Sequence, residues 1–308
     1  MEGTEIKMTD LKFKPVEAED MKVLAPYFGL RPNKTCDSVP LDSFIWRKYY
    51  HVRYAIHENK ALLWLMKEDG VMHSAMPLCK EEDLKKYFDM TVEYFNQVLH
   101  IPFKIYLADE EAIEFLHLKE SEDFVVTEQE DLKDYLYDGE AMRMLSGKKL
   151  HKKKNHLNAF LKEYEGRYEF RRLCCSDRDD VWRFLDRWRE RKGDEVEEHL
   201  DYEVEGIHEI LKQCLDLDIR MSGVYIDGKL EAFTIGSYNQ AENMAVIHIE
   251  KANPEIRGLY QFINQQFLVQ EFPDVTLVNR EDDLGQEGLR HAKMSYNPCG
   301  FARKYLVQ

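Results

Sequence analysis

The chain has 308 residues and a mass of 36.7 kDa, a length that suggests about two domains. Hydrophobic residues make up 44% of it, enough for a sizeable core, which excludes an intrinsically disordered protein. The formal net charge of −15 argues against a general nucleic-acid coat protein, because that class neutralises phosphates with a basic surface. The longest purely apolar run, Ala61–Met66, is too short to span a membrane, and no signal-peptide pattern is present.

The six cysteines give no sign of a metal site or a disulfide framework. Only Cys174 and Cys175 lie close together in the sequence, and the other four are scattered. Adjacent cysteines rarely bridge each other, and no cysteine spacing matches that of a zinc site. We therefore expect free thiols, no bound metal, and a soluble protein of the reducing cytoplasm.

Hydrophobic periodicity gives the first half of the chain a regular order of elements. It predicts helices at residues 17–28 and 41–50, strands at 53–57, 61–66 and 71–76, a long helix at 84–99, a strand at 103–107, a helix at 110–118 and a strand at 124–127. The long helix has the strongest amphipathic pattern, since apolar residues from Leu84 to Leu99 recur at helical spacing.

The second half repeats this order. It predicts helices around residues 181–188 and 204–215, strands at 219–226, 230–238 and 245–250, a helix at 256–267, a strand at 275–278, a helix at 285–293 and a strand at 301–307. Asp227 and Gly228 favour a two-residue hairpin turn. Because the two halves match element by element, we predict a duplicated α+β unit. The expected domains are residues 1–145 and 146–308, joined near residues 138–147.

A basic segment interrupts this acidic chain just after the junction. Between Lys148 and Arg172 there are nine Lys or Arg and only three Glu, and five of the lysines fall within Lys148–Lys154. Apolar residues spaced from Leu157 to Tyr164 predict an amphipathic helix whose first turn is basic. Cations oppose the dipole at a helix N-terminus, so an anionic partner would explain them. The end of a tRNA, an anionic membrane surface and an ordinary solvated linker are the alternatives.

The strand at 245–250 and the turn after it form the first candidate site. Strict alternation would place His248 and Glu250 on one face of this strand, although a structural pair of hydrogen-bonded polar residues would also fit. The strand leads into a helix whose first N–H groups would be free to bind a phosphate or an oxyanion. Gly258 would let such a group approach the backbone closely.

The acidic run Glu281–Asp283 forms the second candidate site. It follows a strand, where sheets of α/β type often place ligands, and capping the next helix needs only one carboxylate. The remaining carboxylates could hold an ammonium group, which a base could deprotonate for attack on a carbonyl. Capping together with solvation is the alternative for each acid.

Several ordered motifs resemble those of a known family. They are Lys154–Phe160, His248–Lys251, Arg257–Asn264, Asn279–Gly285, Gly288–Arg290 and Lys293–Pro298. Together they resemble the cytosolic catalytic domain of phosphatidylglycerol lysyltransferases and its stand-alone relatives. The resemblance implies two GNAT-like acyltransferase folds in tandem. It also implies transfer of an acyl or aminoacyl group from an acyl-CoA or an aminoacyl-tRNA to an amine or hydroxyl.

The resemblance further implies roles for particular residues. The strand at 245–250 would part from the strand at 275–278, and the donor would lie in the gap. Its phosphates would lie at Ile256, Arg257, Gly258, Leu259 and Tyr260. Glu250, Glu281 and Asp283 would be acid, base or amine-recognition groups, and Tyr296 would protonate the leaving group. The residues assigned to substrate binding are His248, Asn279, Asp282, Arg290, Lys293, Lys152, Lys153 and Lys154.

Two functions from different classes therefore stay open. The first is an acyl- or aminoacyltransferase without a covalently bound cofactor. Its donor would be an acyl-CoA or an aminoacyl-tRNA held by Lys148–Lys154, and its acceptor a small molecule, a lipid or a peptide. The second is a non-catalytic sensor that keeps the fold and binds a ligand. Tyr260 favours the sensor, because it stands where a coenzyme A loop has a small residue.

Overall fold

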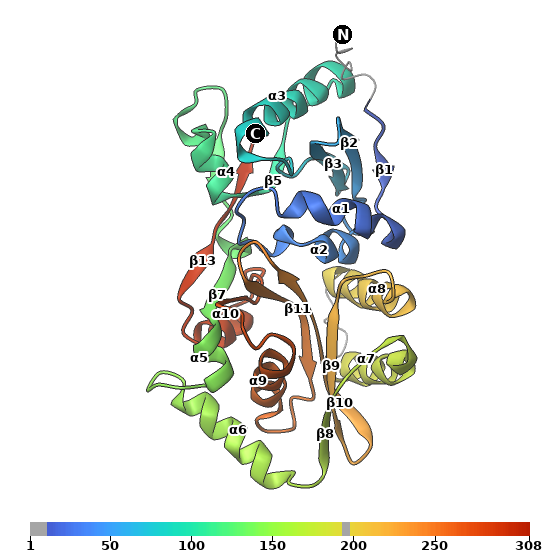
Figure 1. Ribbon diagram of the computed structural model, residues 1–308, viewed down its shortest axis with the longest axis vertical. Helices are drawn as coiled ribbons and strands as arrows, with labels where there is room; N and C mark the ends of the chain where they lie inside the picture. The colour runs from blue at the N-terminus through green and yellow to red at the C-terminus, as the bar shows by residue number, and fades with distance from the viewer. Residues whose placement is uncertain (1–10, 193–197) are drawn as a thin grey trace. The chain divides into compact units, whose positions relative to one another are not determined.

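The computed structural model describes residues 11–192 and 198–308, and the chain divides into two compact units (Figure 1). The first unit holds the chain up to Lys133 together with Ala302–Gln308, and the second is Asp134–Phe301. Both contain sheets flanked by helices, so the predicted α+β class is confirmed. Among the described residues, no helix has the length and apolarity that crossing a bilayer requires.

The first unit contains two small sheets joined by a single bridge. One sheet has the antiparallel order β1 (Lys14–Pro15), β2 (Arg53–His57), β3 (Ala61–Glu68) and β4 (Val71–His73). The other has the order β5 (Ile105–Asp109), β14 (Lys304–Val307) and β6 (Val126–Glu128). A parallel bridge between Ser74 and Ile105 is the only pairing described between them. The helices are α1 (Met21–Phe28), α2 (Pro40–Ile45), α3 (Leu84–Glu93), which continues as a π-helical turn over Tyr94–Leu99, and α4 (Glu110–Phe115).

The second unit is built on one seven-stranded sheet. Its order is β13 (Gly300–Ala302), β7 (Asp134–Asp138), β12 (Leu277–Asn279), β11 (Met244–Ala252), β10 (Lys229–Asn239), β9 (Arg220–Ile226) and β8 (Tyr168–Arg172). The helices are α5 (Gly139–Met144), α6 (His151–Glu163), α7 (Arg178–Lys192), α8 (Glu198–Gln213), α9 (Leu259–Glu271) and α10 (Glu287–Met294). Helices α9 and α6 cover one face of the sheet, and α7 and α8 cover the other (Figure 1).

The predicted repeat is present in the element order of both units. Each runs through two helices, three antiparallel strands, a helix, a strand, a short helix and further strands. In each sheet, however, one strand comes from the other half of the sequence. β14 lies between β5 and β6 of the first unit, and β7 takes the equivalent place between β12 and β13 of the second. The two units therefore do not follow a boundary at residues 145/146, because the repeats exchange one strand each.

The hydrophobic pattern located most elements but misjudged some ends. The final strand, predicted at 301–307, is divided into β13 and β14, and the helix predicted at 41–50 ends at Ile45. The pattern also missed β7 and α5, which lie where the sequence suggested only a junction, and the edge strand β8. Five-residue strands with charged residues give a weak periodic signal, so their pairing is decided by tertiary contacts.

The prediction that all six thiols are free is wrong. Cys175 forms a disulfide with Cys214, 39 residues further along the chain, with the Cα atoms 6.0 Å apart. Cys175 lies in a short 3-10 turn before α7, and Cys214 follows the end of α8. The packing of α7 and α8 brings the two residues together, and a contact between residues so far apart in the chain cannot be predicted from local cysteine spacing. Cys36, Cys79, Cys174 and Cys299 are free.

Candidate active site

The central feature of the second unit is a gap between two parallel strands. β11 and β12 pair over three residues only, from Met244 opposite Leu277 to Val246 opposite Asn279. β12 ends there, while β11 continues to Ala252. Beyond Asn279 no backbone ladder is described between the two strands, and the side-chain pairs Arg280–Glu250 and Glu281–His248 join them instead.

A β-bulge decides which way the polar residues of β11 point. On β10, Ile235 lies opposite Ile249 and Gly236 lies opposite Ile247, which leaves His248 without a partner residue. Glu250 faces α9, whose Asn264 donates a hydrogen bond to it. His248 contacts Ser237 instead, one residue after Gly236, whose α-carbon faces the Phe267 ring of α9. The expectation that His248 and Glu250 share a face is therefore wrong, because the bulge shifts the alternation by one residue.

On the α9 face, the gap is spanned by a buried ion pair. Arg280 Nη2 donates to Glu250 Oε1 at 2.9 Å, and Asn264 Nδ2 donates to Glu250 Oε2 at 2.7 Å. Burial alone would lower the pKa of Arg280, but the Glu250 carboxylate outweighs it, and the pKa is raised. Two buried polar atoms of this group, Arg280 Nη1 and Asn264 Oδ1, have no hydrogen-bond partner among the described residues. One donor and one acceptor of this buried group are thus left without a described partner.

On the opposite face, three side chains form a hydrogen-bonded chain. His248 Nδ1 lies 2.8 Å from Glu281 Oε1, and His248 Nε2 lies 3.0 Å from Ser237 Oγ. The His248 side chain is 1% exposed and that of Glu281 is 20% exposed, so Glu281 is the outer member. A carboxylate that orients an imidazole in this way lets the imidazole accept a proton at its other nitrogen.

Tyr296 lies beside the Arg280 group. Its ring centroid is 4.8 Å from the Arg280 guanidinium and 4.1 Å from Lys153 Nζ on α6, and its hydroxyl accepts a hydrogen bond from Gln261 at 3.3 Å. Burial raises the pKa of Tyr296, so its hydroxyl stays protonated at neutral pH. Burial and the neighbouring Arg280 lower the pKa of Lys153. The structure therefore brings Glu250, Tyr296 and Lys153 together around Arg280.

Asp283 lies in the loop after the gap and is fully engaged. Its carboxylate accepts from Tyr135, from the backbone N–H of Gly285, and from Arg290 through Nε and Nη2, both at 2.9 Å. Burial would raise the pKa of Asp283, but the Arg290 and Tyr135 bonds lower it below its ordinary value. These contacts hold the loop to the start of α10, a positioning role rather than contact with a substrate.

The remaining loop residues predicted to bind substrate also fix the loop. Asn279 donates to Asp134 at 3.0 Å and accepts from the N–H of Glu281 at 2.7 Å. Lys293, which is buried, donates to the carbonyls of Arg280 and Asp282. Burial lowers the pKa of Lys293, although Asp282 and Glu281 oppose this shift. The loop that carries Arg280 and Glu281 is thus anchored from both ends.

The predicted donor turn, Ile256–Tyr260, lies at the start of α9. Gly258 has φ +83° and is buried, and a Cβ there would lie 2.1 Å from the carbonyl oxygen of His156 on α6. The group that approaches this glycine is therefore the backbone of α6. Arg257 is exposed, and burial raises the pKa of the Tyr260 hydroxyl.

The basic segment continues into the site. α6 begins at His151, and its first turn has Lys152 and Lys154 exposed and Lys153 half-buried against Tyr296. Leu157 and Phe160 bury the other side of the helix, as the amphipathic pattern predicted. Lys153 thus joins an exposed basic surface to the buried Arg280 group.

Sequence analysis missed four residues of this site. They are Ser237, Gln261, Asn264 and Arg280. Gln261 and Asn264 lie three residues apart on α9, a spacing that places two polar groups on one side of an otherwise apolar helix. Arg280 lies directly before the acidic run Glu281–Asp283. A single cation next to three carboxylates could have indicated an ion pair at this site.

Solved structures with the same fold cover nearly the whole chain. A conserved protein of unknown function from Bacteroides thetaiotaomicron is 26% identical, with a TM-score of 0.88 over 96% of this chain and 99% of that one. L-PGS from Bacillus licheniformis is 14% identical, with a TM-score of 0.66 over 96% of this chain and 93% of that chain. A tandem GNAT protein from the clavulanic acid biosynthesis pathway is 11% identical, with a TM-score of 0.50 over 97% and 98%.

These likenesses agree with the internal repeat and with the parted strands of the second unit, and they show a tandem GNAT-like fold. In sequence, residues 37–308 match the model of one family, described as the C-terminal part of phosphatidylglycerol lysyltransferase. The chain therefore belongs to the phosphatidylglycerol lysyltransferase C-terminal family, and with it to the broad class of acyl- and aminoacyltransferases.

Proposed function

We propose that the protein transfers an aminoacyl group from an aminoacyl-tRNA to an amine or hydroxyl of a small-molecule or lipid acceptor. The donor carbonyl would lie in the gap between β11 and β12, beside Arg280. With a tRNA donor, the reaction would take place in the cytoplasm. The acceptor would attack the carbonyl carbon, and the ester bond to the tRNA ribose would break.

The single observation that carries this proposal is the pair of unsatisfied buried atoms around Glu250. Within the described parts of the chain, Arg280 Nη1 and Asn264 Oδ1 have no hydrogen-bond partner by geometry. A buried polar group without a partner costs about 1–3 kcal/mol, so a ligand that satisfies both would recover that energy. An aminoacyl ester has the matching groups, a carbonyl oxygen to accept from Arg280 and an ammonium to donate to Asn264.

The charge of Arg280 also suits the transition state. Attack on the carbonyl develops negative charge on its oxygen, and a fixed guanidinium in a buried site stabilises that charge far better than water does. The raised pKa of Arg280 keeps the guanidinium charged, with the Glu250 carboxylate holding it in place.

The two faces of the gap supply the proton transfers. On one face, Glu281, the more exposed member of the hydrogen-bonded chain, would take the proton of the attacking amine or hydroxyl, while His248 holds its carboxylate in place. On the α9 face, Tyr296 would give its proton to the departing ribose oxygen.

Two features favour an ester donor over a thioester. A ribose alkoxide is a much stronger base than a thiolate, so it needs the proton that a tyrosine with a raised pKa retains. In addition, the helix turn at Gly258 is packed against the α6 backbone. The α6 backbone therefore occupies the space beside this turn in which a coenzyme A pyrophosphate would bind. The exposed Lys152 and Lys154 instead suit a nucleic-acid phosphate backbone.

The test is transfer from a charged tRNA to an acceptor mixture, with Tyr296→Phe as the variant. Loss of one hydroxyl that acts as general acid should lower the transfer rate by about 10²–10⁴ and leave donor affinity within about twofold. Tyr168→Phe is the matched control, since Tyr168 packs in the core and its hydroxyl has no described hydrogen bond. Transfer from acetyl-CoA but from no charged tRNA would contradict the proposal.

A non-catalytic ligand-binding role is the second candidate. It is favoured by the pairing of Glu250 with Arg280 and of Glu281 with His248, because paired acids can hold a ligand without titrating. The same experiment separates the two, since a sensor would bind charged tRNA or a related ligand with no turnover, and Tyr296→Phe would change affinity alone.

A further inference from the structure

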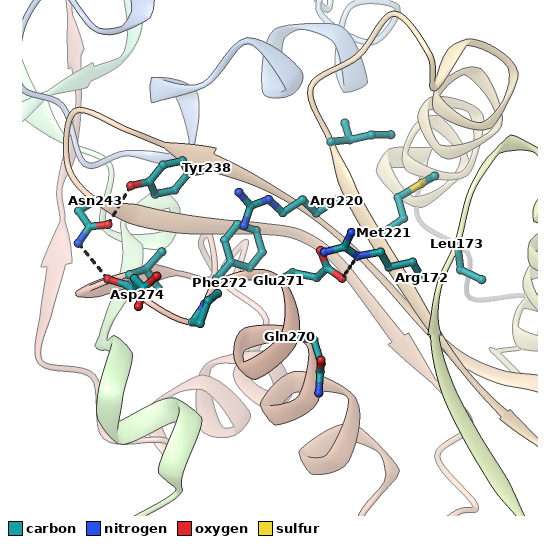
Figure 2. Close-up of a pocket in the computed structure, with 13 residues that line it drawn as sticks. Arg172, Leu173, Arg220, Met221, Tyr238, Asn243, Gln270, Glu271, Phe272 and Asp274 are labelled. Carbon is teal, nitrogen blue, oxygen red and sulfur yellow. Dashed lines mark hydrogen bonds and ion pairs between the residues drawn. The ribbon is translucent and has the colours of Figure 1, made fainter.

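The second unit has a pocket at the C-terminal end of α9. Its volume is about 660 Å³, and thirteen residues from β8, β9, the β10–β11 hairpin and the C-terminal end of α9 line it (Figure 2). Gly258 and Phe272 mark the two ends of α9, and at 1.5 Å per residue these ends are about 20 Å apart. The pocket is therefore distinct from the site around Arg280, which lies toward the other end of the helix.

One guanidinium in this pocket has no ionic partner. Arg220 is half-buried, with its guanidinium carbon 4.4 Å from the Phe272 ring centroid and 5.6 Å from that of Tyr238. In the described parts of the chain, no carboxylate or carbonyl accepts a hydrogen bond from it. A guanidinium carries five N–H donors, and stacking on a ring uses none of them.

The other charged side chains of the pocket are either ion-paired with each other or exposed to solvent. Arg172 Nε donates to the buried Glu271 carboxylate at 2.6 Å, as Figure 2 shows. Asp274 has an exposed side chain, and its backbone carbonyl accepts from Asn243. The Tyr238 hydroxyl donates a hydrogen bond to Asn243 Oδ1. Arg220 is thus the cation that a ligand would meet without having to displace a protein carboxylate.

Apolar side chains form one part of the wall beside these polar groups. Leu173, Ile219, Met221, Phe272 and Val275 line it. Pockets of about 300–1,000 Å³ with apolar walls and a few polar anchors are typical of sites for small organic ligands. An anionic head on Arg220 with an apolar body against these side chains would use both parts of the surface.

We propose that this pocket binds a small amphipathic anion, a carboxylate or phosphate group on an apolar body, with the anionic group paired to Arg220. Guanidinium groups bind both oxyanions through two parallel hydrogen bonds, so the carboxylate and phosphate forms share the same recognition chemistry. The site is separate from the transfer reaction, and its occupancy does not depend on that proposal.

The test is calorimetric titration of the full-length protein with hexanoate, hexyl phosphate and hexanol. At least one of the two anions should bind saturably, and the stronger one identifies the head group. Hexanol has the same body without charge and should bind at least tenfold more weakly than that anion. Arg220→Gln should weaken the anion at least tenfold, whereas Arg167→Gln, which removes an exposed guanidinium paired with Asp227, should leave it unchanged.

Two further variants keep the test decisive. Arg220→Lys retains the charge but loses the planar fork, so it should fold and still bind the anion several-fold more weakly. Glu271→Gln removes the carboxylate that pairs with Arg172 and adds a free guanidinium, so it should bind the anion more tightly. Failure of both anions to saturate the folded wild-type protein would overturn the proposal, as would unchanged binding by Arg220→Gln or equal binding of hexanol.

Discussion

At the scale of single residues, the candidate site is defined by how each buried charge is compensated. Glu250 is held by Arg280, Glu281 by His248, and Asp283 by Arg290 and Tyr135. Among the residues that the structure describes, Arg280 and Asn264 are the members of these groups with buried atoms that lack a partner. The acidic run therefore divides by role, with Glu281 at the gap and Asp283 as an anchor of the loop.

Asp283 should make a pH-dependent contribution to stability. Its pKa is lowered in the folded state, so its contribution is present above the unfolded value of about 3.9 and is lost as pH falls through the folded value. At pH 7, Asp283→Asn should lower the free energy of unfolding by about 2 kcal/mol, because Arg290 and Tyr135 lose a charged partner. Urea titrations between pH 2 and pH 7 measure this.

The difference in unfolding free energy between the wild-type protein and Asp283→Asn should become smaller as the pH falls below about 4. Glu287→Gln is the control, since Glu287 is exposed and its substitution should change stability little at any pH. An Asp283→Asn variant as stable as the wild-type protein at pH 7 would show that the anchor role is mistaken.

At the scale of elements, the structure gives the turn between β11 and α9 a different role from the one that the sequence suggested. A glycine before a helix suggested a phosphate turn, but Gly258 is the point at which α6 packs on the start of α9. This packing places the basic first turn of α6, with Lys153, against Tyr296. The same glycine thereby links the basic segment to the buried site.

Gly258→Ala should be strongly destabilising. Its φ of +83° is unfavourable for an L side chain, and a Cβ would lie 2.1 Å from the His156 carbonyl oxygen, so α6 would have to move. We expect a loss of more than about 2 kcal/mol of unfolding free energy, measured by chemical denaturation. The matched control is Gly288→Ala in α10, where an added Cβ would meet no neighbouring atom within 4 Å. This substitution should be neutral or should raise the unfolding free energy by up to about 1 kcal/mol. Equal effects of the two substitutions would count against this packing role.

At the scale of the whole molecule, the repeat is modified by exchange of one strand in each direction. β14 buries Tyr305 and Val307 in the core of the first unit, although it ends the second repeat. β7 places Tyr135 and Tyr137 in the core of the second unit, where they contact the loop after the gap. The candidate site thus depends on a strand from the first repeat.

The disulfide should stabilise the second unit. It closes a loop of 39 residues, for which the chain-entropy relation gives about 4 kcal/mol. Reduction with dithiothreitol, or Cys214→Ser, should lower the unfolding free energy by about 2–4 kcal/mol, while Cys174→Ser, which removes a free exposed thiol, should have little effect. Thiol titration of the unreduced, denatured protein should find the four free cysteines; six reactive thiols would contradict the bond.

Local periodicity was enough to predict most of the order of elements and the amphipathic helix α6, because each depends on its own residues. Three features depend on distant partners and were not predictable in that way. The bulge at His248 is set by pairing with β10, the exchange of β7 and β14 by the choice of sheet, and the Cys175–Cys214 bond by the packing of α7 on α8. Glu281 and Asp283 were predicted as site residues because carboxylates directly after a strand are conspicuous. Ser237 on β10 and Asn264 on α9 were not predicted, because in the sequence they look like ordinary polar residues.

The most direct test of the account is binding of a non-hydrolysable 3′-aminoacylamido adenosine, which carries the carbonyl and the free ammonium group of a charged tRNA end. Calorimetry should show saturable binding to the wild-type protein and at least tenfold weaker binding to Arg280→Lys, which keeps the charge but loses the guanidinium nitrogen that has no described partner. Arg167→Lys should bind as the wild-type protein does. Unchanged affinity in Arg280→Lys, or no binding by the folded wild-type protein, would contradict a donor site in the gap between β11 and β12.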